Sequence, residues 1–486
     1  MRLLPSILVV GSGCALSLQL PPLWASLAFW LSAGGGYCVL LHKPRKVVLR
    51  LGTLTWSKEE LSRHFLITGD TGSGKTTSGF HQILVQLTRN VPDWGGLVLG
   101  VKGDEHRFIT ELADAHGRSH DLIHLQVRPE GCSTKWLPPH RYNLLGDRSI
   151  PWMTHAKAIV DIASSMTEGG QHAFFRPMAQ IALANAFHLL DEIGHPVTLT
   201  RAYELLTSRT LVEEYVKPFR RNSASPSQRK LADFFDSTFN QAKAYEQREA
   251  IEGTIKTYLS FALDPDVANV FSSDEPDTFT LSQLDHGAII TATMPQRLVT
   301  ERRYIQTYLK ILFYYHVLRR FDKASSERCN ENLLLLVADE FQDLVTASED
   351  GISDHKIVDR IRAAGAVIIA GMQSEISADP ATGATKRKVL TLNMRSRLIF
   401  RAADLEGATA SADFIGKRQI WKPSKTSKPF GAVTYTRKEE EEYLVKPTKL
   451  MRLPDHTAII AHPSKRYSKK RLVPVDGSGK TYGWFR

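Results

Sequence analysis

Short apolar runs alternate with helical stretches over much of the chain. Runs rich in apolar and β-branched residues occupy 96–102, 122–126, 287–294, 333–340, 365–373 and 397–402. Amphipathic stretches such as Tyr304–Arg320 separate several of them. Strands that are apolar on both faces and separated by helices are typical of a mainly parallel sheet covered on both sides. The pattern predicts an α/β fold, with one or two further strands at 46–56.

The stretch 150–278 interrupts this alternation. It has little strand character, and its apolar residues recur at the spacing of three and four residues that suits packed helices. We therefore expect an all-α domain inserted into an α/β domain. The predicted organisation is an N-terminal anchor at 1–46, the first part of the α/β domain at 47–149, the inserted domain at 150–278, and the second part at 279–486, which ends in a basic tail.

The N-terminal region contains two long uncharged stretches. Leu3–Leu20 and Leu23–Leu41 have no charged residue, and two prolines divide them. Each is near the length of about 20 residues that crosses a bilayer as a helix. The basic residues that follow favour the cytoplasmic side. The pattern predicts transmembrane helices at about 3–20 and 23–41. A cleaved signal peptide and a buried hairpin of a soluble protein stay open as alternatives.

Charge and cysteine content narrow the chemistry. The chain of 486 residues has 62 Lys and Arg against 51 Asp and Glu, which gives a net charge of +11. This excess suits a nucleic acid or an anionic lipid as partner. The charge run Lys438–Tyr443 is expected on a solvated face or in a loop. No zinc site or disulfide framework is expected from the four cysteines, Cys14, Cys38, Cys132 and Cys329, because none forms a C-x-x-C pair.

The segment Gly69–Thr76, GDTGSGKT, matches the phosphate-binding pattern G-x-x-x-x-G-K-[ST]. An apolar run precedes it and a helical pattern follows it, so its backbone N–H groups can surround phosphates at a helix N-terminus. Lys75 is expected to reach the β- and γ-phosphates of ATP, and Thr76 to ligate Mg²⁺. The expected nucleotide-binding residues here are Gly69, Asp70, Thr71, Gly72, Ser73, Gly74, Lys75, Thr76 and Thr77.

A second GSGKT occurs at Gly477–Thr481. The spacing of a phosphate loop requires glycine at position 474, where Pro474 stands, and few residues follow for a helix. We expect this segment to be a flexible basic tail and not a nucleotide site.

The segment Asn332–Leu344, NLLLLVADEFQDL, predicts a buried strand with Asp339 and Glu340 at its C-terminal end. Open α/β sheets bind their ligands at that edge. Asp339 is expected to hold Mg²⁺ through water, and Glu340 to orient and deprotonate the attacking water. Gln373 ends the next apolar run, where a neutral amide can sense the γ-phosphate or hold the water.

Arg362 precedes the run that Gln373 ends. An arginine supplied by a neighbouring subunit can stabilise transition-state charge and raise the rate by roughly 10³–10⁵. We expect Lys75, Glu340, Gln373 and Arg362 to form the catalytic set, with Thr76 and Asp339 as the magnesium residues.

Several segments of the chain, taken together in the order in which they occur, resemble those of the coupling proteins of type IV secretion and conjugation. The resemblance extends over nearly the whole chain, and one departure is Gly100, where that family often has an acidic residue. It rests on the uncharged N-terminal pair, RHFLITGDTGSGKTT, GVKGDEH, RYNLLGD, LSFALDPDVANVFSS, LLLLVADEFQDL, the R-x-x-G pattern of Arg362–Gly365, NMRSRLIFRAAD and LMRLPDHTAIIAH.

The resemblance implies a RecA-like P-loop ATPase that forms a homo-hexamer at the bacterial inner membrane, with its ATPase domain in the cytoplasm and lipid around the N-terminal hairpin. It implies that ATP hydrolysis moves single-stranded DNA, with an attached relaxase, to the components of a type IV secretion channel. It also implies that Arg63 contacts phosphate, on its own or a neighbour's nucleotide, and that the inserted domain receives substrate.

Two basic stretches are candidates for DNA contact, and two other functions stay open. Basic stretches with few aromatics suit sequence-independent contact with phosphates, although a solvated face or a lipid contact explains them as well. The other functions are a nucleotide-gated receptor that recruits protein effectors without moving DNA, and a double-stranded DNA translocase of the chromosome-segregation kind. The basic residues are Lys386, Arg387, Lys388, Arg395, Arg397 and Arg401, and then Lys465, Arg466, Lys469, Lys470 and Arg471.

Overall fold

The computed structural model describes residues 46–485 except 102, 104, 167–174, 241–244, 277, 325–326, 328–330, 349–350 and 427–433. The two predicted transmembrane segments lie outside these residues, so the anchor stays a prediction. Within the described residues, no helix combines the length and apolar character needed to cross a bilayer. From Val48 onward the chain forms one compact unit.

The centre of this unit is a nine-stranded sheet in the order β13-β12-β9-β3-β8-β7-β4-β6-β5. The strands from β3 to β9 pair in parallel, and β12 and β13 continue the sheet antiparallel at one edge. All six predicted runs form strands, so the mainly parallel α/β fold is confirmed. The strands are β3 (Phe65–Thr68), β4 (Gly95–Leu99), β5 (Leu122–Gln126), β6 (Ile289–Thr293), β7 (Leu334–Ala338), β8 (Ala366–Met372), β9 (Ser396–Ile399), β12 (Thr457–Ala461) and β13 (Ser468–Arg471).

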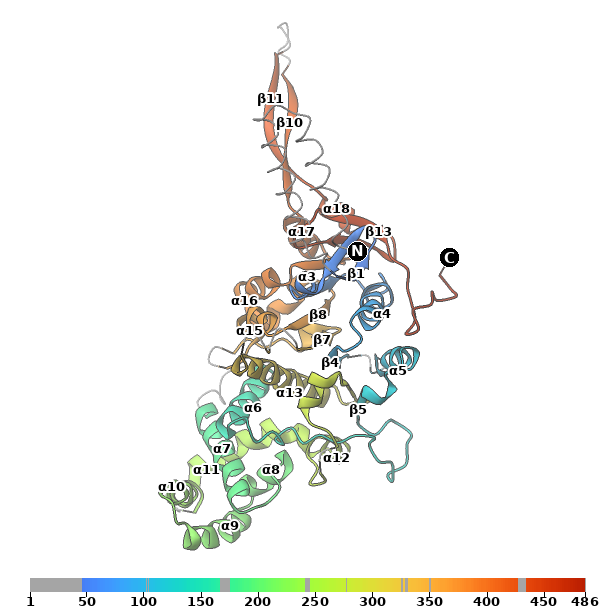
Figure 1. Ribbon diagram of the computed structural model, residues 1–486. Coiled ribbons are helices and arrows are strands. Elements are labelled where there is room, and N and C mark those ends of the chain that lie inside the picture. The colour runs from blue at the N-terminus through green and yellow to red at the C-terminus, as the bar shows by residue number, and fades with distance from the viewer. Residues whose placement is uncertain are drawn as a thin grey trace, which may run out of the picture. The chain divides into compact units, whose positions relative to one another are not determined.

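Helices cover both faces of the sheet because the central strands are apolar on both sides. In β7, Leu334 and Leu336 belong to one hydrophobic cluster, whereas Leu335 and Val337 belong to another on the opposite face. The helices that pack on these faces surround the sheet in Figure 1. They are α4 (His81–Asn90) and α5 (Glu105–Ala115) on one face, and α13 (Val299–Leu318), α15 (Asp354–Ala363) and α16 (Asp379–Asn393) on the other.

After the loops of 127–151, the described regular elements before β6 are all helices, as the apolar spacing of 150–278 predicts. Helix α6 packs on α7 and on α13, so the helical segment shares one hydrophobic cluster with a face of the sheet. The exact boundaries of an inserted domain at 150–278 stay a prediction. The helices are α6 (Trp152–Met166), α7 (Arg176–Glu192), α8 (Leu199–Thr207), α9 (Arg209–Asn222), α10 (Pro226–Phe235), α11 (Tyr245–Leu259) and α12 (Pro265–Phe271).

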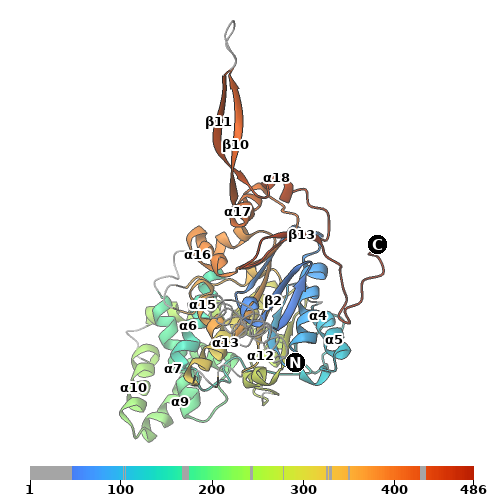
Figure 2. The same cartoon turned by 45° about the horizontal axis from the view of Figure 1, so that its top comes forward.

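Two strands form a separate antiparallel hairpin, β10 (Lys417–Thr426) and β11 (Thr434–Tyr443), which Figures 1 and 2 show projecting beyond the sheet. The charge run at 438–443 therefore belongs to a strand and not to a loop. Its glutamates pair across the hairpin with basic residues of β10, as in Lys422–Glu440, which favours the strand. The remaining described strands and α-helices are β1 (Val47–Leu51), β2 (Leu54–Ser57), α3 (Lys58–Leu61), α17 (Leu405–Ile415) and α18 (Pro447–Leu450).

The C-terminal segment lies against α4 and α5, so the expectation of a flexible tail was wrong. Val475 N–H donates to Thr77 O at 3.2 Å, and Arg89 Nη2 donates to Ser478 O at 2.9 Å. The second GSGKT forms a turn in which Asp476 Oδ1 accepts from Ser478 and Lys480. These contacts explain why the segment is ordered without being a phosphate loop.

Candidate nucleotide-binding site

The loop Gly69–Gly74 follows β3 at the carboxyl edge of the parallel strands and leads into η1 (Lys75–Phe80) and then α4. Gly74 has φ 105°, a left-handed conformation that favours glycine. A Cβ there would lie 2.7 Å from His456 Nδ1, and a Cβ at Gly69 would lie 2.7 Å from Phe400 Cβ. The glycines of the motif are thus required both by backbone conformation and by close packing.

Lys75 turns back into the loop that precedes it. Its side chain is buried, and Nζ donates to Gly69 O at 2.7 Å and to Asp70 O at 3.1 Å. The ammonium group is therefore held at the centre of the loop, close to the helix N-terminus that attracts anions.

Thr76 and Asp339 meet at this edge of the sheet. Thr76 Oγ1 donates to Asp339 Oδ2 at 3.2 Å, although the residues are 263 positions apart. Asp339 is buried, and the absence of a side chain at Gly371 makes room for it, because a Cβ there would lie 2.7 Å from Asp339 Oδ1. A hydroxyl and a carboxylate oxygen fit Mg²⁺, which is usually held by one or two carboxylates together with water and substrate phosphates.

Glu340 and Gln373 lie at the same edge, after the ends of the neighbouring strands β7 and β8. Glu340 has φ 52°, an uncommon conformation for a non-glycine residue that is found at functional sites. Its Oε2 accepts from Gln342 Nε2 at 2.8 Å. Gln373 directly follows β8 and is exposed, and its backbone oxygen accepts from Gly69 N–H at 3.1 Å. Strands β3, β8 and β7 thus bring Lys75, Gln373 and Glu340 to one edge.

The departure at Gly100 has a structural counterpart in Glu105. A Cβ at Gly100 would lie 2.0 Å from Glu105 Cδ, so the glutamate side chain occupies the space that an acidic residue at 100 would need. Glu105 also lines a cavity of about 450 Å³ together with Thr76, Thr77, Asp339 and Tyr482. The segment GVKGDEH contains Glu105, but no sequence pattern indicated that its side chain approaches Gly100.

Arg401 contacts the phosphate loop through Asp70. Its Nε lies 3.0 Å from Asp70 Oδ2, and Nη1 lies 2.6 Å from Asp455 Oδ1. These ion pairs make Arg401 a support of the loop, a role that the basic stretch did not indicate.

Two further basic residues of that stretch are buried. Arg397 pairs with Glu375 at 2.8 Å, and Arg387 pairs with Asp379 at 2.7 Å. Both therefore act within the fold. Lys388 and Arg395 remain exposed, and so do the basic residues of the second stretch: Lys465, Arg466, Lys469, Lys470 and Arg471.

Arg63 and Arg362 lie at the opposite, amino edge of the sheet. Arg63 precedes β3, whereas the phosphate loop follows it, so Arg63 does not lie in the phosphate loop of its own chain. Arg362 is exposed near the end of α15, before β8. The seven residues of β8 separate it from Gln373, a distance of about 20 Å at the rise of a strand.

His64 joins the elements that carry these two arginines. Its Nδ1 accepts from Ile368 N–H at 3.0 Å, so Nε2 carries the proton and donates to Val358 O at 2.6 Å. Burial lowers the pKa of His64 to about 4, which keeps the ring neutral at pH 7.

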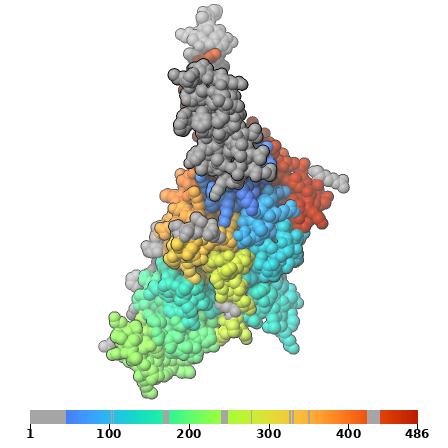
Figure 3. Space-filling view, viewed as in Figure 1, coloured from blue at the N-terminus to red at the C-terminus, as the bar shows by residue number. Residues whose placement is uncertain are grey.

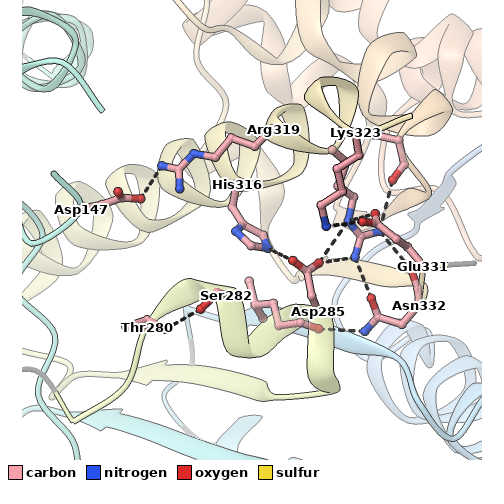
Figure 4. A network of polar contacts seen from close by, with 12 residues as sticks. Asp147, Thr280, Ser282, Asp285, His316, Arg319, Lys323, Glu331 and Asn332 are labelled. Atoms are coloured by element: carbon pink, nitrogen blue, oxygen red, sulfur yellow. Dashed lines mark hydrogen bonds and ion pairs between the residues drawn. The ribbon is translucent and has the colours of Figure 1, made fainter. Parts of the chain in front are cut away.

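A buried polar network supports the same edge (Figure 4). Arg320 Nη1 donates to Ala364 O at 3.2 Å and to Asn332 O at 3.0 Å, and Nη2 pairs with Asp285 at 2.5 Å. Burial opposes ionisation of Asp285, yet hydrogen bonds from His316 and Arg320 lower its pKa below the usual range. The network fixes the turn that follows Arg362.

Comparisons with known proteins agree with this fold. A profile described as the type IV secretion-system coupling protein DNA-binding domain matches residues 143–469, which is more than half of the chain. No curated protein sequence matches. The bacterial conjugative coupling protein TrwBdeltaN70 in its unbound monoclinic form has a TM-score of 0.65 at 16% identity, over 92% of this chain and 94% of that one.

Two further solved structures are of the plasmid coupling protein TrwB with nucleotides. The complex with ADP and Mg²⁺ has a TM-score of 0.61 at 16% identity, over 93% of each chain. The complex with the non-hydrolysable ATP analogue ADPNP has a TM-score of 0.63 at 16% identity, over 92% of this chain and 94% of that one. At this identity, the likeness shows the shared fold.

Proposed function

The chain belongs to the family of type IV secretion-system coupling proteins, and from this premise we propose that it is a membrane-anchored ATPase that moves single-stranded DNA, with its attached relaxase, into a secretion channel. The hydrogen bond between Thr76 and Asp339 carries the ATPase part of the proposal, because it joins the phosphate loop to the acidic strand end. The nucleotides bound to the plasmid coupling protein TrwB support ATP and Mg²⁺ as ligands.

In this proposal each residue has a distinct task in hydrolysis. Lys75 exchanges the carbonyl oxygens of Gly69 and Asp70 for phosphate oxygens. Thr76 and Asp339 hold Mg²⁺, which neutralises charge on the phosphates. Glu340 takes the proton of the attacking water, and Gln373 orients that water next to the γ-phosphate.

Arg362 acts on the nucleotide of a neighbouring subunit, and Arg63 contacts phosphate on the same neighbour. Their place at the amino edge supports action in trans, since their own phosphate loop lies at the other end of the strands. A ring of subunits, which we propose to be a homo-hexamer, places the amino edge of one subunit against the carboxyl edge of the next. The two N-terminal segments anchor this ring in the inner membrane, with the ATPase domain in the cytoplasm.

The test is steady-state ATPase activity of the full-length chain, purified in detergent, with and without single-stranded DNA and with double-stranded DNA of the same length. We expect single-stranded DNA to stimulate turnover several-fold. Lys75→Ala should lack both the basal and the stimulated activity.

The outcomes separate the candidate functions. Stimulation by double-stranded DNA alone would favour the chromosome-segregation kind of translocase. An ATPase rate that neither DNA changes would favour the receptor that recruits protein effectors. Equal turnover in Lys75→Ala and the unaltered chain would contradict the assignment of the ATP site.

A further inference from the structure

The residues expected around the γ-phosphate lie on one side of the phosphate loop in the sheet order. Gln373 and Asp339 lie on the side of β8 and β7, so the γ-phosphate faces these strands. The other neighbours of β3 are β9 and then β12. In a nucleotide bound with its γ-phosphate on the side of β7, the ribose and base would lie on the side of β9 and β12.

His456, directly before β12, lies on that side and contacts the loop. Its N–H donates to Ser73 O at 2.8 Å, and its Nδ1 lies 2.8 Å from Ser78 Oγ. Its Cα lies 3.1 Å from the position of a Cβ on Gly74. The imidazole is therefore fixed beside the phosphate loop.

The C-terminal aromatic residues gather around this histidine. The Trp484 ring centroid lies 5.4 Å from that of His456 and 5.6 Å from that of Tyr482, with an angle of 18° between the planes of Trp484 and Tyr482. Tyr482 also lines the cavity that α4, α5 and the ends of β4 and β7 enclose, so the C-terminal rings extend along both sides of the loop. Figure 3 shows the C-terminal part of the chain, in red, next to the blue surface of the N-terminal part of the compact unit.

Hydrogen bonds hold this segment in place. Val475 N–H donates to Thr77 O at 3.2 Å, and His81 Nδ1 donates to Val475 O at 2.9 Å. Trp484 is nevertheless 60% exposed, although its ring contacts those of His456, Tyr482 and Phe485, so part of the indole can contact a ligand. Aromatic side chains bind nucleobases by stacking, which works for every base because each has a π-face.

We propose that Trp484, supported by Tyr482 and His456, is the stacking platform for the base of the bound nucleoside di- or triphosphate. This inference rests on the proposed ATP site and adds a base subsite to it. Stacking on the indole does not select one base by hydrogen bonds. Its contribution to binding affinity therefore depends on the presence of a base in the ligand and not on the phosphates.

The test compares two ligands that differ in the nucleoside, ADP and inorganic pyrophosphate, each binding with Mg²⁺ to the full-length chain in a displacement assay. Trp484→Ala should weaken ADP binding about tenfold, as expected for the loss of one stacked base, and should leave pyrophosphate binding within twofold. Trp484→Phe keeps an aromatic face and should stay within about threefold for both ligands. Trp421→Ala removes another exposed tryptophan, 64% exposed on the hairpin, and should change neither.

Two results would overturn the platform. The first is an unchanged ADP affinity in Trp484→Ala. The second is an equal loss for ADP and pyrophosphate, which would make Trp484 a support of the loop. If Lys75→Ala removes binding of both ligands while Trp484→Ala removes neither, only the platform fails. If the unaltered chain binds neither ligand, the ATP site itself fails and the platform fails with it.

Discussion

Thr76 donates a hydrogen bond to Asp339 over 3.2 Å, and this contact joins two motifs that are 263 positions apart in the chain. Both oxygen atoms belong to the ligand class that Mg²⁺ prefers. Thr76 and Asp339 would therefore hold Mg²⁺ at this point, where the cation would neutralise charge on bound phosphates.

Asp339→Asn tests the metal role of this contact. The amide keeps the size of the side chain and one oxygen, but it lacks the negative charge that holds the cation. We expect ATP affinity in EDTA to stay within about twofold and the gain in affinity on adding Mg²⁺ to fall about tenfold or more, measured by displacement of a fluorescent nucleotide. Asp343→Asn, on the same segment, should keep the full Mg²⁺ effect. An unchanged Mg²⁺ effect in Asp339→Asn would remove Asp339 from the metal site.

Mixing two inactive variants tests action in trans. Glu340→Gln keeps Arg362 but lacks the base, and Arg362→Ala keeps the base but lacks the arginine. Each alone should hydrolyse ATP at least about 100-fold more slowly, because each removes a group that we propose to act in the transition state. In mixed rings, an Arg362→Ala subunit whose neighbour supplies Arg362 has a complete site, so we expect turnover to recover partly.

A matched control for this experiment is Arg360→Ala, an exposed arginine on the same helix, which should keep normal turnover. Mixtures that stay as inactive as the separate variants would place Arg362 outside a neighbour's site.

The pattern of apolar positions was sufficient to predict the sheet, because burial on both faces of a strand leaves a strong local signal in the sequence. In β7, successive leucines contact opposite hydrophobic clusters, and only a strand covered by two layers needs such a run. The phosphate loop was equally readable, since its glycines are required by left-handed backbone and close packing within a few residues.

Contacts between segments that are far apart in the chain left no comparable signal in the sequence. Arg401 looked like one member of a basic stretch, and its pairing with Asp70 arises only because β9 lies beside β3. The C-terminal segment looked like a flexible tail. Its order depends on hydrogen bonds to Thr77 and to His81, which lies 394 positions before Val475, and no local pattern indicates them. Such roles follow from strand order, which the sequence does not state.

The lowered pKa of the buried His64 ring predicts that the folded chain loses stability in acid. Its pKa is about 4 in the folded chain and about 6.5 when unfolded, so the unfolded state binds more protons between these values. The stability from the neutral ring is complete above pH 6.5 and falls as the pH drops towards 4, by about 2 kcal/mol at pH 5. We expect the Tm of the full-length chain to fall between pH 7 and pH 5.

The share of His64 is measured with His64→Gln, which has no titrating ring. This variant should have a lower Tm at pH 7, but a smaller further fall at pH 5. His120→Gln changes an exposed histidine and should follow the unaltered chain at both values. If His64→Gln loses as much between pH 7 and pH 5 as the unaltered chain, protonation of His64 does not contribute.

The buried pair of Lys310 and Asp354 gives the largest expected change in stability. Both side chains are fully buried, with Lys310 Nζ 2.5 Å from Asp354 Oδ2. Burial lowers the pKa of Lys310, so its ammonium form depends on the carboxylate. Lys310→Met leaves the carboxylate without its cation, which costs about 3–5 kcal/mol, and should lower the Tm by several degrees.

The double variant Lys310→Met with Asp354→Asn separates the two contributions to that cost. Removing both charges leaves no uncompensated ion in the core, so the double variant should have a higher Tm than Lys310→Met alone. Tyr314 OH still has an amide oxygen to donate to in place of Asp354 Oδ1, which it contacts at 2.6 Å. A double variant less stable than Lys310→Met would mean that the hydrogen bonds of Asp354, and not its charge, hold α15 in place.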